Sequence, residues 1–289
     1  MHSAEPSRDD PSESPTANLA LARSMNSNQQ NSSSAGSAVR DRGDHFSTQA
    51  ADYATFRPHY PAELFAFLAG VVPRRELAWD CATGNGQAAV PLSRYFSHIV
   101  ATDISAAQLR HAEPHERIEY RVARAHDSGL PTGSVDLVTV AQALHWLDLP
   151  AFYSEVERVL APNGLLSVWS YGSASVDTDA LTECVAHLEF DILGKHWPEG
   201  RALVGEALRD LPFPFEELES PVFTLNASWR LDQLVGYTRS WSATTRYVSE
   251  RGRDPIPDFE RELRAHWGDP ASRHVVHWPF VLRVGRVRG

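Results

Sequence analysis

Short apolar runs alternate with amphipathic segments through the middle of the chain. Runs with the length and apolar content of buried strands lie at 77–80 (LAWD), 98–103 (HIVATD), 118–123 (IEYRVA), 135–144 (VDLVTVAQAL) and 164–171 (GLLSVWSY). The intervening segments GQAAVPLSRYF, SAAQLRHA and AFYSEVERVLAP have helical spacing. Because parallel strands need crossover connections, this alternation predicts an open, mostly parallel sheet with helices on both faces.

Further helices flank this alternating region. Apolar side chains recur at helical spacing from Pro61 to Val72, so one helix is expected before the first strand. Residues 177–270 carry helical segments, several Trp, Phe and Pro residues, and one strand near PVFTLNA.

The N-terminal segment, residues 1–42, is rich in Ser, Asn, Ala, Asp and Pro and has few residues that can bury apolar surface. This composition predicts a disordered tail. An interaction arm or a lid that orders on binding is the alternative.

Composition narrows the classes of partner. The 289 residues include 27 Lys and Arg against 37 Asp and Glu, a formal net charge of −10, which disfavours nucleic acid as a partner. Cys81 and Cys184 are far apart and form no metal-ligand motif, which favours a reducing cytoplasm and no metal site. No segment has the pattern of an export signal or the roughly 20 apolar residues of a membrane span.

Acidic and glycine residues lie where the first two strands end. Asp80 ends the first strand, Gly84 and Gly86 follow it, and Asp103 ends the second strand. Glycines let a backbone turn tightly against a ligand, and a carboxylate at the second strand end can accept both hydroxyls of a ribose. Asp80 would sit poorly beside a pyrophosphate but favours an ammonium group. Because Gly84, Gly86 and Ala89 also fit the dinucleotide pattern G-x-G-x-x-A, an NAD(P)-dependent oxidoreductase stays open as an alternative.

Seven motifs together carry a family resemblance. They are HFSTQAADYATFRPHYP, LAWDCATGNGQAA, VATDIS, SVDLVTVAQALHWLD, LAPNGLLSVWSY, SWSATTRY and WPFVLRVGR. The sequence resembles the class I S-adenosylmethionine-dependent methyltransferases, in the small-molecule branch (methyltransferase type 11) that includes trans-aconitate methyltransferase-like proteins. The resemblance spans about Phe46 to the C-terminus.

This resemblance implies an α/β, Rossmann-like three-layer sandwich. Its sheet would have seven strands in the order 3-2-1-4-5-7-6 with one antiparallel strand, for which VVHWPFVLRVGRV is the candidate. The methyltransferase domain would cover 43–289, with the cofactor-binding core at about 77–171 and the cap and C-terminal strands at about 177–289. The helical segments of 177–270 would form a cap over the ligand site, where substrate choice would reside.

The resemblance also implies the residues that bind S-adenosyl-L-methionine. They are Asp80, Ala82, Gly84 and Gly86 for the methionyl part and ribose, Asp103 for the ribose hydroxyls, Ile104 for one adenine face, Ala125 and His126 for the adenine edge, and Tyr53, Arg57 and Gln142 around the methionyl end. Arg57 would hold the methionyl carboxylate, unless it is an exposed or helix-capping arginine. His126 replaces the acidic residue expected at its position, so we expect its backbone to make the contact.

His145 and Trp146, at the end of the fourth strand, are the catalytic candidates. Methyl transfer from a sulfonium is an in-line displacement, in which the protein aligns the nucleophile and excludes water. A base is needed only if the acceptor must lose a proton, and His145 would then accept it. Otherwise His145 bonds the backbone and shapes the pocket. The expected function is methylation of a small-molecule carboxylate, hydroxyl or thiol, with a catalytically silent cofactor-binding domain as a further alternative.

Overall fold

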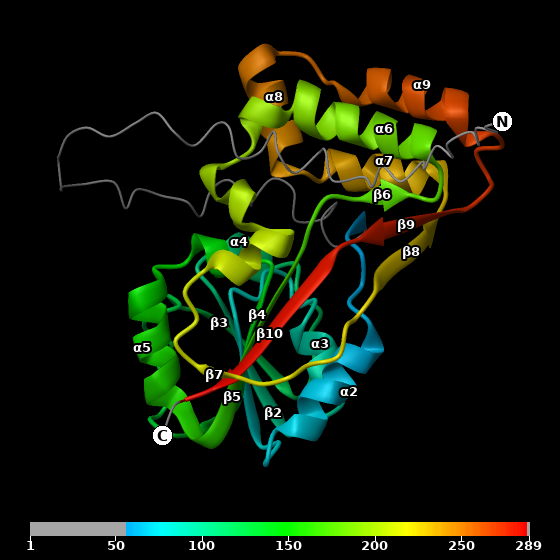
Figure 1. Ribbon diagram of the computed structural model, residues 1–289. Coiled ribbons are helices and arrows are strands. Elements are labelled where there is room, and N and C mark those ends of the chain that lie inside the picture. The colour runs from blue at the N-terminus through cyan, green and yellow to red at the C-terminus, as the bar shows by residue number, and fades with distance from the viewer. Residues whose placement is uncertain (1–55, 288–289) are drawn as a thin grey trace, which may run out of the picture. The chain divides into compact units, whose positions relative to one another are not determined.

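The computed structural model describes residues 56–287, so the predicted tail, residues 1–42, and Tyr53 lie outside the described residues. A seven-stranded sheet forms the centre of the described chain (Figure 1). Its strands lie in the order β3 (Ile118–Val122), β2 (His98–Asp103), β1 (Leu77–Cys81), β4 (Val135–Ala141), β5 (Leu160–Tyr171), β10 (Phe280–Arg286) and β7 (Glu216–Glu217). The neighbours from β3 to β5 pair in parallel, and β10 is antiparallel to β5 and β7. The predicted order and the single antiparallel strand are confirmed.

Helices cover both faces of this sheet. On one face, α2 (Ala62–Val71) and α3 (Ala89–Leu92) share an apolar cluster with Leu137 of β4. On the other, α5 (Leu149–Val159) packs with Val138 of the same strand. Since successive side chains of a strand point to opposite faces, a strand covered on both sides is mostly apolar. β4 fits this apart from Asp136 and Thr139, which are buried and hydrogen-bonded. A short helix, α4 (Ala106–Leu109), follows β2.

The cap contains a second sheet as well as helices. β6 (Ser175–Val176), β9 (His274–Trp278) and β8 (Leu225–Trp229) form a three-stranded antiparallel sheet. The helices α6 (Asp179–Ala186), α7 (Leu231–Arg239), α8 (Ser242–Arg251) and α9 (Ile256–Trp267) lie together beyond it, on the side away from the main sheet (Figure 1). The expected cap was helical apart from one strand near PVFTLNA, which β8 overlaps. The pairing of this strand with β6 and β9 is an addition to that expectation.

The candidate C-terminal strand is two strands. Its first half, β9, belongs to the cap sheet, and its second half, β10, belongs to the main sheet. Pro279 separates them. Proline has no N–H to donate to a ladder, so the pairing changes sheets at this residue.

Short helical turns connect the cap to the carboxyl ends of β4 and β5. They are the 3₁₀ turns η3 (Leu144–Trp146), η5 (Gly194–His196), η6 (Glu199–Leu203) and η7 (Gly205–Asp210), and the π-helix η4 (His187–Ile192). A Cβ at Gly205 would lie 2.8 Å from the Cα of Gly172, so glycine lets η7 approach the end of β5. Among residues 56–287, no helix is long and apolar enough to cross a lipid bilayer.

Candidate functional site

The loop after β1 has a left-handed backbone at three positions. The φ angles are 55° at Ala82, 60° at Gly84 and 90° at Gly86. Ala82 carries a Cβ, so its conformation costs roughly 1–2 kcal/mol, which the surrounding structure must offset. The Thr83 amide donates to the Thr102 carbonyl at 2.9 Å, which ties the loop to β2. Strain of this kind is concentrated at functional sites.

Asp80 is fully buried beneath this loop, near the carboxyl end of β1. Its two carboxylate oxygens accept hydrogen bonds from Thr83 Oγ1 at 2.5 Å and Thr139 Oγ1 at 2.7 Å. Burial raises the pKa of Asp80 to about 6, against the hydrogen bonds from the two threonines, which lower it. The carboxylate is therefore ionised at neutral pH and favours a cation.

Asp103 ends β2 and reaches the same loop. Its Oδ2 accepts from the Gly84 amide at 2.8 Å, and its Oδ1 accepts from the Ser105 amide at 2.8 Å. Burial raises the pKa of Asp103. A carboxylate oxygen has two acceptor positions, so both oxygens keep capacity for ligand hydroxyls. Asp80 and Asp103 thus flank one turn from adjacent parallel strands.

Two exposed apolar side chains lie beside Asp103. Ile104 is 59% exposed, and Val122, which is in register with Asp103 on β3, is 61% exposed. Apolar side chains of this size gain from being covered, so they suit the face of an aromatic base. Val122 was not among the predicted site residues, because the predicted strand ran on to residue 123, whereas β3 ends at Val122.

The two loop glycines have different surroundings. Among the described residues other than Gly84 and its two chain neighbours, no heavy atom lies within 4 Å of a Cβ placed on Gly84, whereas a Cβ on Gly86 would lie 2.5 Å from Tyr120 Oη. Tyr120 donates to the Glu113 carbonyl at 3.1 Å, and burial raises its pKa to about 12, so the hydroxyl stays protonated. The turn is open at Gly84 and packed at Gly86.

The predicted adenine-edge residues lie in a tight turn. Ala125 and His126 stand between Arg124 and Asp127, which form an antiparallel bridge with an amide-to-carbonyl distance of 3.1 Å. Ala125 is half-buried and His126 is exposed.

Gln142 follows β4 with a φ of 54° and bonds to the end of β5. Its Nε2 donates to the Tyr171 carbonyl at 3.1 Å. Its Oε1 accepts from Ser170 Oγ at 2.5 Å and from the Tyr171 amide at 3.1 Å. The side chain therefore positions the two strand ends relative to each other.

His145 and Trp146 lie in η3, against the cap. Their ring centroids are 4.7 Å apart, and a Cβ on Gly200 would lie 2.8 Å from His145 Cδ2. Burial lowers the pKa of His145 to about 4, and the positive charge of Arg201 contributes. His145 is therefore neutral at pH 7 and a weak base.

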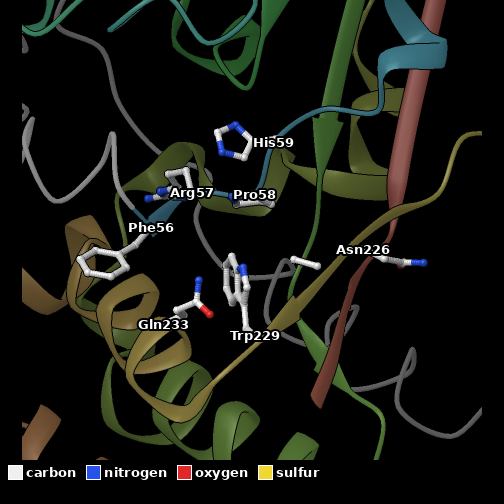
Figure 2. Close-up of a pocket in the computed structure, with 8 residues that line it drawn as sticks. Phe56, Arg57, Pro58, His59, Asn226, Trp229 and Gln233 are labelled. Carbon is white, nitrogen blue, oxygen red and sulfur yellow. The ribbon is translucent and has the colours of Figure 1, made fainter. Parts of the chain in front are cut away.

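Arg57 lies between the end of β5 and the cap. It donates to Tyr171 Oη and to the Ser240 carbonyl, each at 3.3 Å, and its guanidinium is 5.4 Å from the ring centroid of Tyr237. Arg57 also borders a small cavity that Trp229 and Gln233 line from the cap (Figure 2).

The described site residues thus form four groups along the carboxyl edge of the sheet, and one of these groups, Ala125 and His126, follows β3. The first, at β1 and β2, contains Asp80, Ala82, Gly84, Gly86, Asp103 and Ile104. Gln142, His145 and Trp146 follow β4, and Arg57 lies beside β5. Ligands bind at this edge in open α/β sheets. Over residues 56–287, no group of three or more His, Cys, Asp or Glu side chains is arranged to hold a metal ion.

Comparisons with known proteins agree on one class. Residues 79–168 match the family model described as "Methyltransferase domain". A Dictyostelium discoideum protein named "Putative methyltransferase" is 34% identical over 223 residues, 76% of this chain and 85% of that protein. A Saccharomyces cerevisiae protein named "Probable S-adenosylmethionine-dependent methyltransferase" is 27% identical over 282 residues, 83% of this chain and 96% of that protein. The solved structure of a "Putative Type II Methyltransferase" from Anaeromyxobacter dehalogenans has a TM-score of 0.74 and 41% identity, and the match covers 80% of this chain and 98% of that one.

Proposed function

Since the chain belongs to the class I S-adenosylmethionine-dependent methyltransferases, we propose that it methylates a small-molecule carboxylate, hydroxyl or thiol by in-line displacement. The observation that carries the proposal is the convergence of Asp80 and Asp103 on a turn that is open at Gly84. Family membership disfavours the nicotinamide alternative. We also propose, from the sequence motifs, that the chain belongs to the trans-aconitate methyltransferase-like branch.

The residues around the turn fit the cofactor in charge and shape. Asp103 would accept the ribose hydroxyls, Ile104 would cover one face of the adenine, and Asp80, ionised at neutral pH, would favour the ammonium group. Bound S-adenosylmethionine supplies a methyl group already activated on a sulfonium sulfur. Val122 would extend the apolar surface beneath the base.

The protonation state of His145 indicates which chemical class of methyl acceptor the chain favours. A pKa of about 4 leaves the imidazole neutral at pH 7 and therefore able to accept a proton, but too weakly basic to remove one efficiently from an alcohol. This favours acceptors that are anionic before the reaction, a carboxylate or a thiolate. His145 and Trp146 would then orient the acceptor and exclude water.

The test is a screen of carboxylate, phenol, thiol and amine acceptors with labelled S-adenosylmethionine, followed by product mass. We expect a methylated carboxylate or thiol together with S-adenosylhomocysteine. Calorimetry with the cofactor alone accompanies the screen. Absence of S-adenosylmethionine binding would contradict the proposal. Binding of the cofactor with no turnover for any of the acceptors tested would indicate a catalytically silent domain.

A further inference from the structure

A buried carboxylate in the cap has one oxygen without a partner. Glu189 is 1% exposed and lies in the π-helix η4. Its Oε1 accepts from Ser173 Oγ at 2.7 Å and from Arg201 Nη2. Its Oε2 is buried and has no hydrogen-bond partner among the described residues. An unsatisfied charged oxygen is costly, and π-helical turns occur frequently at functional sites.

This carboxylate stands beside the predicted reaction site. Ser173 follows β5 by two residues, so Glu189 lies near the carboxyl end of that strand, where ligands bind in this architecture. Arg201 directly follows Gly200, and a Cβ on Gly200 would contact both His145, at 2.8 Å, and Trp146, at 3.5 Å. The Glu189–Arg201 pair therefore approaches the catalytic candidates from the cap.

The pair is fixed in position, and its charges balance. The guanidinium of Arg201 lies 4.5 Å from the ring centroid of Trp197, and Trp197 Nε1 donates to the Glu189 carbonyl at 3.0 Å. Because Arg201 compensates the charge of Glu189, the unpaired oxygen suits a neutral donor better than a cation. A hydroxyl group is the donor of that kind most often present on small polar molecules.

We propose that Oε2 of Glu189 binds a hydroxyl group of the methyl acceptor, distinct from the group that is methylated. The chain then selects hydroxylated acceptors over analogues that lack the hydroxyl, because the analogue leaves a buried carboxylate oxygen unpaired. This proposal rests on the proposed function, since it takes the region where the cap meets the ends of β4 and β5 as the acceptor site.

The test is a binding measurement that does not depend on turnover. The full chain is saturated with S-adenosylhomocysteine and titrated by calorimetry with two matched pairs, 4-hydroxybenzoate and benzoate, and 3-hydroxybutyrate and butyrate. A charge-assisted hydrogen bond predicts that the hydroxylated member of at least one pair binds about 10- to 100-fold more tightly. In Glu189→Gln this ratio should fall to less than about 3-fold.

Glu155 offers a matched control. It is also a buried glutamate, 7% exposed, that accepts from a serine hydroxyl (Ser128 Oγ, 2.5 Å) and pairs with an arginine, Arg158. Both of its oxygens are bonded within the protein, Oε2 by Arg158 Nε at 2.8 Å. Glu155→Gln should therefore leave the binding ratio unchanged, whatever it does to the melting temperature.

Several outcomes would overturn the proposal: no preference in either pair for the wild type, a preference that survives in Glu189→Gln, or a preference lost equally in Glu155→Gln. If Glu189→Gln does not fold, the affinity ratios of the two ligand pairs for the wild type decide whether the proposal holds. Failure of the proposed function is separate, because it shows as absent binding of S-adenosylmethionine and S-adenosylhomocysteine to the wild type.

Discussion

Asp80 is a buried acid whose ionisation costs stability. Its pKa is about 6 in the folded chain and 3.8 without burial, so the folded state holds this proton more tightly than the unfolded state does. The contribution of Asp80 to stability is therefore fully present below pH 3.8 and is lost as the pH rises through about 6. At pH 8 the loss amounts to something on the order of 3 kcal/mol.

The variant Asp80→Asn removes this titration. We expect the difference between the free energies of unfolding, Asp80→Asn minus wild type, to increase as the pH rises from 4 to 8. Most of this increase should occur between pH 4 and pH 6. Urea unfolding at several pH values measures it. A difference between the two proteins that does not vary with pH would contradict the buried, proton-binding state of Asp80.

Asp103 should contribute directly to cofactor affinity. Loss of a charged acceptor for the ribose hydroxyls in Asp103→Ala predicts about 10- to 100-fold weaker binding of S-adenosylmethionine by calorimetry. Asp136 is a matched control, because it is a buried aspartate that also accepts from two backbone amides, those of Glu76 and Leu77. Asp136→Ala should lower the melting temperature and leave the affinity within about twofold. Equal losses of affinity in both variants would mean that Asp103 acts only through folding.

His145 should not titrate in the physiological range. Because burial lowers its pKa to about 4, its protonation does not change between pH 6 and pH 8. With an acceptor that is already anionic, we expect kcat/KM to show no inflection from His145 over this interval, in the wild type or in His145→Asn. An inflection near pH 6.5 in the wild type that His145→Asn abolishes would show that His145 is more solvated and acts as a base.

Strand-terminal residues could be predicted from the sequence, and their partners could not. Asp80 and Asp103 end apolar runs, so their shared edge follows from the pattern alone. The hydrogen bond from Thr139 to Asp80 joins residues 59 positions apart. The pairing of Glu189 with Arg201 likewise depends on how the cap folds, and a single glutamate in a helical segment gave no signal of it.

At the scale of the element, the loop between β1 and α3 depends on its glycines to different degrees. Gly84→Ala meets open space and carries mainly the cost of its positive φ, about 1 kcal/mol. Gly86→Ala adds an overlap with Tyr120 and should cost about 1–3 kcal/mol more. Thermal unfolding of the two variants without ligand measures the difference. Equal destabilisation would mean that Tyr120 moves away freely.

The long strands of the main sheet were predictable from the sequence, but its two-residue edge strand β7 was not. Of the cap sheet, only the strand near PVFTLNA, which overlaps β8, was predicted. The largely apolar run of β4 predicts a strand, because burial on both faces favours apolar side chains at most positions. The cap sheet pairs β6, of two residues, with β9, almost 100 positions later in the chain. A strand of two residues has no periodicity to detect, and the sequence from His274 to Arg286 reads as one strand unless Pro279 is given its weight.

At the scale of the whole molecule, the apolar core is divided between the main sheet and the cap. Two clusters lie on the two faces of the main sheet, and a third, which includes Trp229, Trp267 and Trp278, holds the cap together. The candidate site lies along the carboxyl edge of the main sheet, and cap residues reach it at His145. A ligand held from both sides would therefore stabilise the two parts together.

Ligand-dependent stability distinguishes the cofactor classes on the full chain. A ligand that binds only the folded state stabilises it by about 2.7 kcal/mol at 100 times its Kd. S-adenosylmethionine and S-adenosylhomocysteine should therefore raise the melting temperature by several degrees at saturation, whereas NAD(H) at the same concentration should not. Asp103→Ala should shift the dose dependence to higher concentration, because its bonds to the ligand are lost. Its melting temperature without ligand should also fall, because the Gly84 and Ser105 amides lose their acceptor. A larger rise in melting temperature with NADH than with S-adenosylmethionine would mean that the turn at Gly84 accepts a pyrophosphate beside Asp80. That result would contradict the cofactor assignment, which depends on the negative charge of Asp80 disfavouring a pyrophosphate.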